Sequence, residues 1–195
     1  MQNKILVSLS VFIFFIAACS NNKTSVNKPA QDSIEDHSFF PVTQFVKGQL
    51  KEIDSMPVTP LRITTFNQHI DSVWLKKENI RPFAEPFLHP KIDSAYINNF
   101  YTKKSFLDQS INDVTLTYDK KNISTDPASI AVYINPQTNK VTRIFMVKES
   151  NGNTGHQTIQ LTWTANKWCQ VTTIIEKENT PPQIKQDKLI WDFTE

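Results

Sequence analysis

The pattern of hydrophobic and polar positions divides the chain into an earlier part that favours helices and a later part that favours strands. Between residues 39 and 55, apolar side chains recur at the three- and four-residue spacing of one helix face. This spacing predicts an amphipathic helix, with Pro41 in its first turn and its apolar side against a sheet of the same domain. The apolar positions are Val42, Phe45, Val46, Leu50 and Ile53.

Two short hydrophobic runs follow this helix. Residues 60–66 and 71–77 are strand-like, and the polar stretch 67–70 between them fits a turn. The segment therefore predicts a β-hairpin.

A proline-rich segment and a second stretch with helical spacing come next. Because proline inside a helix removes a backbone hydrogen bond, Pro86 predicts that a short helical turn starting near Pro82 is broken or kinked afterwards. Residues 93–108 show a partial helical period, and Asp93 or Ser94 is suited to cap that helix.

From residue 114 onward the pattern changes to strand alternation. In residues 158–164, Ile159, Leu161 and Trp163 alternate with threonine and glutamine, so one side of the strand is apolar and the other is threonine-rich. We expect an α+β domain, with an antiparallel β-meander of about five to six strands packed against amino-terminal helices. The strand-like runs are residues 114–119, 129–135, 140–149, 158–164, 167–176 and 188–193.

The amino terminus has the pattern of a secretory signal. A basic residue, Lys4, precedes an apolar run over residues 5–18. As a helix this run spans about 21 Å, too short for a bilayer core of about 30 Å. It ends in Ile16-Ala17-Ala18-Cys19, which resembles the bacterial lipobox, and this resemblance implies cleavage before Cys19 and acylation of its thiol. The alternative is an ordinary signal peptide with an incidental cysteine.

The chain thus divides into a signal peptide at residues 1–18, a lipidated cysteine and flexible tether at 19–38, and one domain at 39–195. The tether is polar, and as a flexible coil its typical reach is about 25 Å. Ser20, and not an aspartate, follows Cys19, which resembles the outer-membrane sorting signal of enteric-type lipoproteins. Acidic residues just after the cysteine resemble a surface-export signal in Bacteroidota-like bacteria, and none is present here. The two resemblances imply a lipid-anchored protein of the outer membrane that faces the periplasm.

Three segments carry a resemblance to a known family: residues 39–54 (FFPVTQFVKGQLKEID), residues 84–94 (AEPFLHPKIDS) and residues 164–170 (TANKWCQ). With the lipobox, they resemble a family of Bacteroidota lipoproteins without a known activity. The resemblance covers most of residues 39–193 and implies an envelope location. It implies no catalytic residue.

Composition limits the classes of function. The net charge of +2 gives little support for binding nucleic acid. Three glycines cannot build a phosphate-binding loop, a dinucleotide fingerprint or a nucleophile elbow, and no cofactor is predicted. With Cys19 committed to lipid, Cys169 has no partner for a disulfide within the chain, and its strand-like surroundings predict a buried thiol.

Two pairs of polar residues are candidates for a catalytic or metal-binding site. Glu85 and His89 are four residues apart, which would place them on one side of a helix, but no third ligand is near in sequence. His69 and Asp71 lie at the predicted hairpin tip, where polar residues are common. Surface and capping roles are favoured for all four, so no catalytic or metal-binding residue is predicted.

Tryptophans are the strongest candidates for binding. Trp163 falls on the apolar side of its strand, which favours a place in the core. Trp74, Trp168 and Trp191 are less determined by pattern, and we consider them candidate binding residues.

Four Asp-Ser pairs are each followed by an apolar or small residue. This triplet resembles the O-glycosylation acceptor motif of Bacteroidota envelope proteins, which implies modification of the serine. The alternative is turn and cap chemistry, for which Asp-Ser is also suited. The four serines are Ser33, Ser55, Ser72 and Ser94.

These observations favour a lipid-anchored, non-catalytic envelope protein, held to the membrane through Cys19, whose domain binds another protein or an envelope component. A carrier of a lipid or other apolar ligand is the second hypothesis, and a hydrolase of cell-wall or glycan material is the third. A binding protein predicts an exposed apolar patch, a carrier predicts a closed apolar cavity, and a hydrolase predicts a polar cleft with two ionisable groups.

Overall fold

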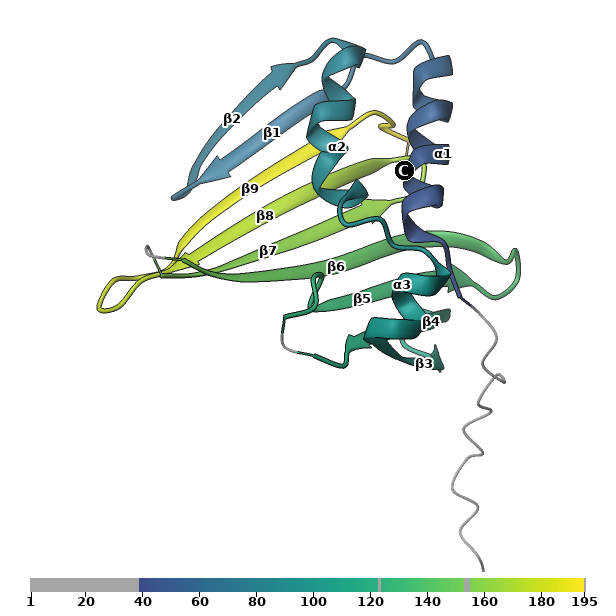
Figure 1. Cartoon of the computed structure of the whole chain (residues 1–195). Coiled ribbons are helices and arrows are strands. Elements are labelled where there is room, and N and C mark those ends of the chain that lie inside the picture. The colour runs from purple at the N-terminus through teal and green to yellow at the C-terminus, as the bar shows by residue number, and fades with distance from the viewer. Residues whose placement is uncertain (1–38, 123, 153–154, 195) are drawn as a thin grey trace, which may run out of the picture. The chain divides into compact units, whose positions relative to one another are not determined.

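The computed structural model describes residues 39–122, 124–152 and 155–194. The predicted signal peptide (1–18), the predicted tether (19–38), Cys19 and Ser33 lie outside these residues. The described residues form one nine-stranded sheet, three α-helices and one short 3-10 helix (Figure 1). No helix in this part of the chain is long and apolar enough to cross a membrane.

Helices are confined to the first half of the described chain. In chain order the elements are α1 (Val42–Ser55), β1 (Leu61–Phe66), β2 (His69–Trp74), η1 (Lys77–Asn79), α2 (Ile80–Leu88), α3 (Ser94–Phe100), β3 (Tyr101–Asp108), β4 (Asp113–Lys120), β5 (Ser129–Asn135), β6 (Lys140–Gly152), β7 (Gly155–Thr164), β8 (Trp168–Glu176) and β9 (Gln183–Ile190).

The sheet is antiparallel throughout, with the strand order β2-β1-β9-β8-β7-β6-β5-β4-β3. Strands β3 to β9 form a meander, and the β1–β2 hairpin joins it beside β9 (Figure 1). The predicted antiparallel sheet is confirmed, but the predicted five to six strands are too few. The hairpin belongs to the same sheet because β1 pairs with β9 over six residues.

Strand β3 accounts for the rest of the difference in strand number. The sequence pattern predicted helix over residues 93–108, but α3 ends at Phe100 and Tyr101–Asp108 pairs with β4 along its whole length. Backbone pairing with β4 outweighs the partial helical period, because tertiary context overrides weak local preference. The helix cap was predicted correctly: the Asp93 carboxylate accepts a hydrogen bond from the backbone N–H of Tyr96 at 3.0 Å.

Helix α2 continues through Pro86 to Leu88, so a break at Pro86 is wrong, whereas a kink there stays a prediction. Pro86 cannot donate to the carbonyl of Pro82, but the helix ends at Leu88 and only its last turn loses this bond. Phe87, in that last turn, is fully buried. Its ring meets the ring of Trp163 edge-on, with centroids 5.3 Å apart, and this contact places the end of α2 against β7.

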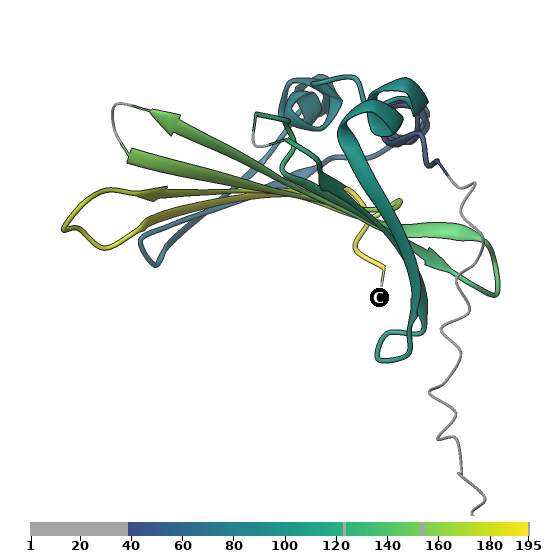
Figure 2. The ribbon, with the colours of Figure 1, turned by 60° about the horizontal axis from the view of Figure 1, so that its bottom comes forward.

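The hydrophobic core lies on one side of the sheet, where Figure 2 shows all three helices. A hydrogen-bonded side chain also connects α1 to the turn between β7 and β8. Gln49 accepts from the backbone N–H of Asn166 at 2.7 Å and donates to the Asn166 side chain at 2.8 Å. The buried residues of α1 include the predicted apolar positions Val42, Val46, Leu50 and Ile53.

The predicted β-hairpin is confirmed, and its turn is two residues long. Asn67 and Gln68 have positive φ angles of 48° and 67°, as a type I′ hairpin turn requires. His69 and Asp71 lie beyond this turn, in strand β2, so their predicted place at the hairpin tip is wrong. The tight turn takes up only the first two residues of the polar stretch.

Candidate functional site

The side of the sheet opposite the helices carries no helix of the described chain, and we call it the open face (Figure 2). In β7, Leu161 and Trp163 are buried on the helix side, so Thr162 and Thr164 point to the open face. The alternation in residues 158–164 predicted these two sides. The pairing register extends the assignment from β7 to the neighbouring strands.

Three aromatic side chains of the open face fall on one line across the strands, which we call the aromatic row. Trp74 is three strands away from Trp168, and Trp168 is three strands away from Tyr133. Each step is about 14 Å at the usual spacing of strands. In strand order the row is Trp74, Leu61, Ile190, Trp168, Thr164, Arg143 and Tyr133.

Two cations accompany the aromatic row. The Arg143 guanidinium carbon lies 4.1 Å from the Tyr133 ring centre, and the Lys188 ammonium lies 4.2 Å from the Trp168 ring centre. Both geometries are those of attractive cation–π contacts. Along the same strands, Glu149 lies opposite Thr158 and Glu176 lies opposite His156, so carboxylates also fall at open-face positions, and Glu149 pairs with Lys120 at 2.8 Å.

Hydroxyl and amide side chains occupy much of the open face between the rings. Gln170, for example, donates to the Thr172 hydroxyl at 3.2 Å. The centre of the open face therefore offers many hydrogen-bonding groups. The polar side chains of this centre are Gln160, Thr162, Thr164, Gln170, Thr172 and Gln186.

The β2 edge of the sheet is more apolar and more exposed than the centre of the open face. All six residues of β2 are exposed. Trp74 is 60% exposed, and its ring packs on Phe193 with centroids 5.8 Å apart. Ile70, on the same side of β2, is 66% exposed. Exposed apolar side chains gathered in this way are typical of a binding surface.

The outer edge of β2 has one local backbone contact. In a two-residue hairpin, Phe66 and His69 are a hydrogen-bonded pair, so the N–H of Ser72 points away from β1. The Asp71 carboxylate accepts a hydrogen bond from this N–H at 2.9 Å.

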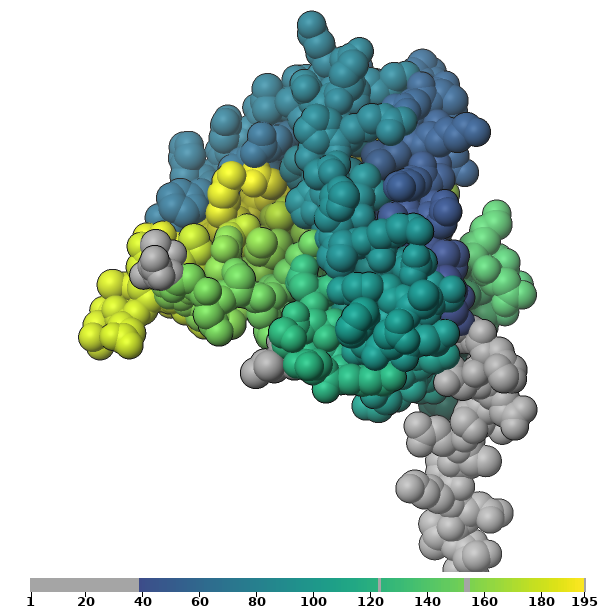
Figure 3. Space-filling view, in the orientation of Figure 1, coloured from purple at the N-terminus to yellow at the C-terminus, as the bar shows by residue number. Residues whose placement is uncertain are grey.

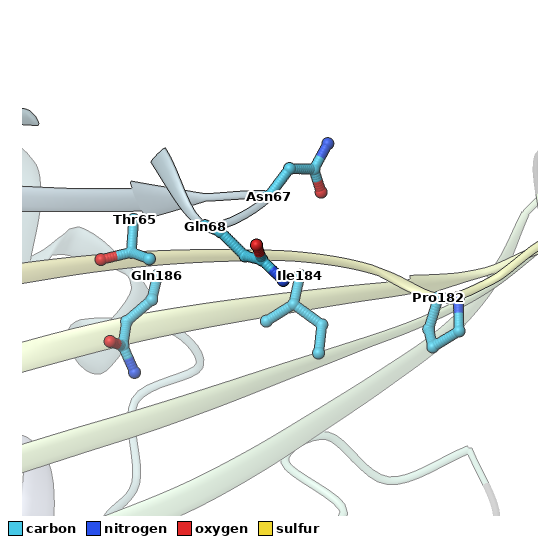
Figure 4. Close-up of a pocket in the computed structure, with 6 residues that line it drawn as sticks. All are labelled: Thr65, Asn67, Gln68, Pro182, Ile184 and Gln186. Carbon is cyan, nitrogen blue, oxygen red and sulfur yellow. The ribbon is translucent and has the colours of Figure 1, made fainter. Parts of the chain in front are cut away.

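A small pocket of about 350 Å³ lies between the β1–β2 turn and the start of β9 (Figure 4). In Figure 4 the Gln68 side chain extends towards Ile184, whereas Asn67 points away from the strands. The pocket combines amides and a hydroxyl with two apolar side chains. Its lining is Thr65, Asn67, Gln68, Pro182, Ile184 and Gln186.

A second hollow, of about 450 Å³, lies on the helix side beside α2, where the helices cover only part of the sheet (Figure 3). Its wall includes an ion pair: Asp187 accepts from Arg62 at 2.7 and 3.0 Å, and from the Thr64 hydroxyl at 2.6 Å. Burial favours the neutral form of Asp187. The bonds from Thr64, Arg62 and Lys185 outweigh burial and lower its pKa.

The two candidate acid–base pairs lie on different elements, one at the end of α2 and the other on β2. Glu85 and His89 form an exposed pair at the end of α2, with 2.8 Å between Oε1 and Nε2. His69 and Asp71 are exposed on β2. In the described part of the chain, no group of three or more His, Cys, Asp or Glu residues could hold a metal ion.

The three candidate tryptophans have different environments. Trp74 and Trp168 share the open face, as described above. Trp191 is only 3% exposed and packs on Trp163 at 5.3 Å, so it belongs to the core instead of a binding surface. Cys169 is fully buried, as predicted, and burial raises the pKa of its thiol well above the ordinary value.

The three candidate glycosylation sites within the described residues are exposed. Ser55 ends α1 and donates to the carbonyl of Glu52 at 2.6 Å, Ser72 lies on β2, and Ser94 begins α3. Exposure permits modification and does not establish it, so glycosylation stays a prediction.

Sequence reasoning missed Tyr133, Arg143 and Lys188 as members of the candidate site. None of them belongs to a local motif, and only strand register brings Tyr133 and Arg143 into line with Trp168. A search for aromatic and basic residues at alternating positions in the strand-like runs would have included all three.

Comparisons with protein-family models, curated proteins and solved structures found no match.

Proposed function

We propose that the protein is a lipid-anchored, non-catalytic binding protein of the bacterial cell envelope, held at the outer membrane and facing the periplasm. Its open face binds a protein or another envelope component. The observation that carries this proposal is the position of Trp74 and Trp168 on one side of the sheet that no described helix covers. The exposed apolar edge at Ile70 and Phe193 adds to the same surface.

The anchor part of the proposal depends on Cys19. Replacing Cys19 by Ala should leave the chain uncleaved and release it from lipid attachment. Membrane fractionation and intact-mass measurement test this: wild-type protein should carry acyl chains and the C19A variant none. A C19A variant with the same mass and membrane fraction as the wild type would contradict the anchor.

The binding part can be tested by photo-crosslinking in the native host. A photoreactive residue in place of Gln170, on the open face, should give one specific adduct. The same residue in place of Lys51, exposed on α1, should give none. Loss of the Gln170 adduct when Trp168 is also changed to Ala would tie it to the aromatic row. Equal labelling from Gln170 and Lys51 would contradict the proposal.

A carrier of an apolar ligand is the alternative that one observation favours. The hollow beside α2 is about 450 Å³, within the range of ligand pockets. Its wall contains the Arg62–Asp187 ion pair, unlike the closed apolar cavity that the carrier hypothesis predicts. Mass spectrometry of solvent extracts of the purified protein tests the alternative, since a bound lipid at one mole per mole would favour it.

A further inference from the structure

We infer that the open face binds an acidic polysaccharide, with the sugar chain lying across the strands along the aromatic row. This inference rests on the proposed function, because it names the class of envelope component that the open face binds.

The spacing of the aromatic row favours a long ligand with repeating units. Trp74, Trp168 and Tyr133 are separated by equal steps of three strands, about 14 Å each. Sugar rings pack their C–H faces on aromatic rings, and tryptophan and tyrosine offer large apolar rings with a polar group at the rim. An extended chain of sugars perpendicular to the strands would pass each ring in turn.

The groups between the rings favour a ligand rich in hydroxyls over a protein partner. A protein interface has a closely packed apolar centre with aromatic anchors. The centre of the open face carries Thr162, Thr164 and Gln170, with further threonines and glutamines around them and Phe145 opposite Thr162. Hydroxyl and amide groups can donate to and accept from sugar hydroxyls at every position along such a chain.

The charges near the centre of the open face favour an acidic polysaccharide. Arg143 and Lys188 are basic, and the nearby open-face carboxylate of Glu149, opposite Thr158, is already paired with Lys120 at 2.8 Å. A guanidinium stacked on a ring, as Arg143 is on Tyr133, presents its N–H groups at its rim, where a carboxylate or sulfate binds them in pairs. A cation thus lies over the ring of Tyr133 and over the ring of Trp168, so a bound sugar chain meets the cation together with the ring at these two positions.

The test is affinity electrophoresis of the membrane-anchored protein, purified in detergent, through gels that contain a polysaccharide. The acidic probes are polygalacturonate and dextran sulfate. Their matched neutral controls are methyl-esterified polygalacturonate and plain dextran, which keep the sugar backbone and lack its charge. We expect retardation by at least one acidic probe, weaker retardation at higher salt, and at least tenfold weaker binding to the matched neutral polymer.

Variants then separate the aromatic row from general attraction of charge. R143Q combined with K188Q, and separately W168A, should each weaken binding at least tenfold. K51Q, on the helix side, removes one positive charge and should leave binding unchanged. Circular dichroism spectra and thermal melting identify a variant that fails to fold, and Y133L then replaces W168A as the test of the aromatic row.

Three results would overturn the inference: no retardation by either acidic probe, equal retardation by the neutral controls, or equal losses in K51Q and in the open-face variants. The photo-crosslinking experiment distinguishes this failure from failure of the proposed function. A protein adduct from the Gln170 position without polysaccharide binding removes the acidic ligand and leaves the binding role intact.

Discussion

The same strands contribute buried apolar side chains to the helix side of the sheet and partly exposed polar side chains to the open face. On the helix side, β7 contributes Leu161 and Trp163, which are fully buried beneath α2 and its neighbours. On the open face, the same strand contributes Thr162 and Thr164, which stay partly exposed. Because side chains alternate along a strand, adjacent residues of β7 belong to the core on one side and to the proposed binding surface on the other.

The aromatic residues of the two sides differ in what surrounds them. Trp163 packs against Phe87 and Trp191, so its position is determined by neighbouring rings in the core. Trp168, five residues later in the chain, lies beneath the ammonium of Lys188 at the surface. Residue type alone therefore does not distinguish a tryptophan of the core from a candidate binding residue.

The largest expected effect belongs to the helix side. F87A removes a fully buried ring from the contact between α2 and β7 and should lower the free energy of unfolding by about 3–5 kcal/mol. W74A, which removes a ring that is 60% exposed, is the control and should cost less than about 1 kcal/mol. Urea unfolding measures both, and equal losses would break the distinction between the two sides.

Loss of the hydrogen bonds between α1 and the β7–β8 turn should have the second largest effect on the free energy of unfolding. Gln49 is 7% exposed and satisfies both the backbone N–H and the side chain of Asn166. Q49A leaves that N–H without its partner and should cost about 2 kcal/mol. Q44A, at an exposed position of the same helix, should stay within about 0.5 kcal/mol. A comparable loss in Q44A would assign the effect to the helix alone.

The ion pair beside α2 should give a smaller effect that depends on pH. Asp187 has a lowered pKa in the folded protein, so its ionised form stabilises the fold above the ordinary value of 3.8 and this contribution is lost as the pH falls below it. D187N should cost about 1 kcal/mol at pH 7, and the difference from wild type should shrink in acid. Chemical unfolding from pH 7 to pH 3 measures this difference, and a constant gap would contradict it.

The smallest effect should come from the β2 edge. I70A changes a side chain that is 66% exposed and should alter the free energy of unfolding by no more than about 0.5 kcal/mol. The same substitution at Ile130, which is 1% exposed on the helix side, should cost about 2–5 kcal/mol. A thermal melt of each variant gives the comparison. A large loss in I70A would mean that the edge is part of the core.

Local patterns were sufficient for several elements and insufficient for others. The alternation of Thr162 with Trp163 predicted the two sides of β7 because side-chain direction depends on neighbouring residues alone. Strand β3 could not be predicted in this way, since its pairing with β4 overrides a partial helical period at Phe100 and Phe106. Pro86 misled for a similar reason, because burial of Phe87 holds the last turn of α2 in place.

Prediction of the candidate site would have required the pairing of strands that are distant in the sequence. Trp168 and Trp191 both stood in strand-like runs, and only the fold places one on the open face and the other against Trp163. Tyr133 and Arg143 reach the line of Trp168 through three consecutive registers. No pattern of hydrophobic and polar positions contains that information, because a shift of any one pairing by two residues would disperse the row.

The hydrogen bond from Ser72 to Asp71 bears on how the protein behaves at high concentration. A sheet that does not close has an outer strand whose free backbone groups can recruit further chains and start aggregation. The Asp71 carboxylate engages one of the outward donors of β2 and adds a negative charge to that margin. Both the hydrogen bond and the charge oppose the addition of a further strand at this edge, where apolar side chains are in contact with solvent.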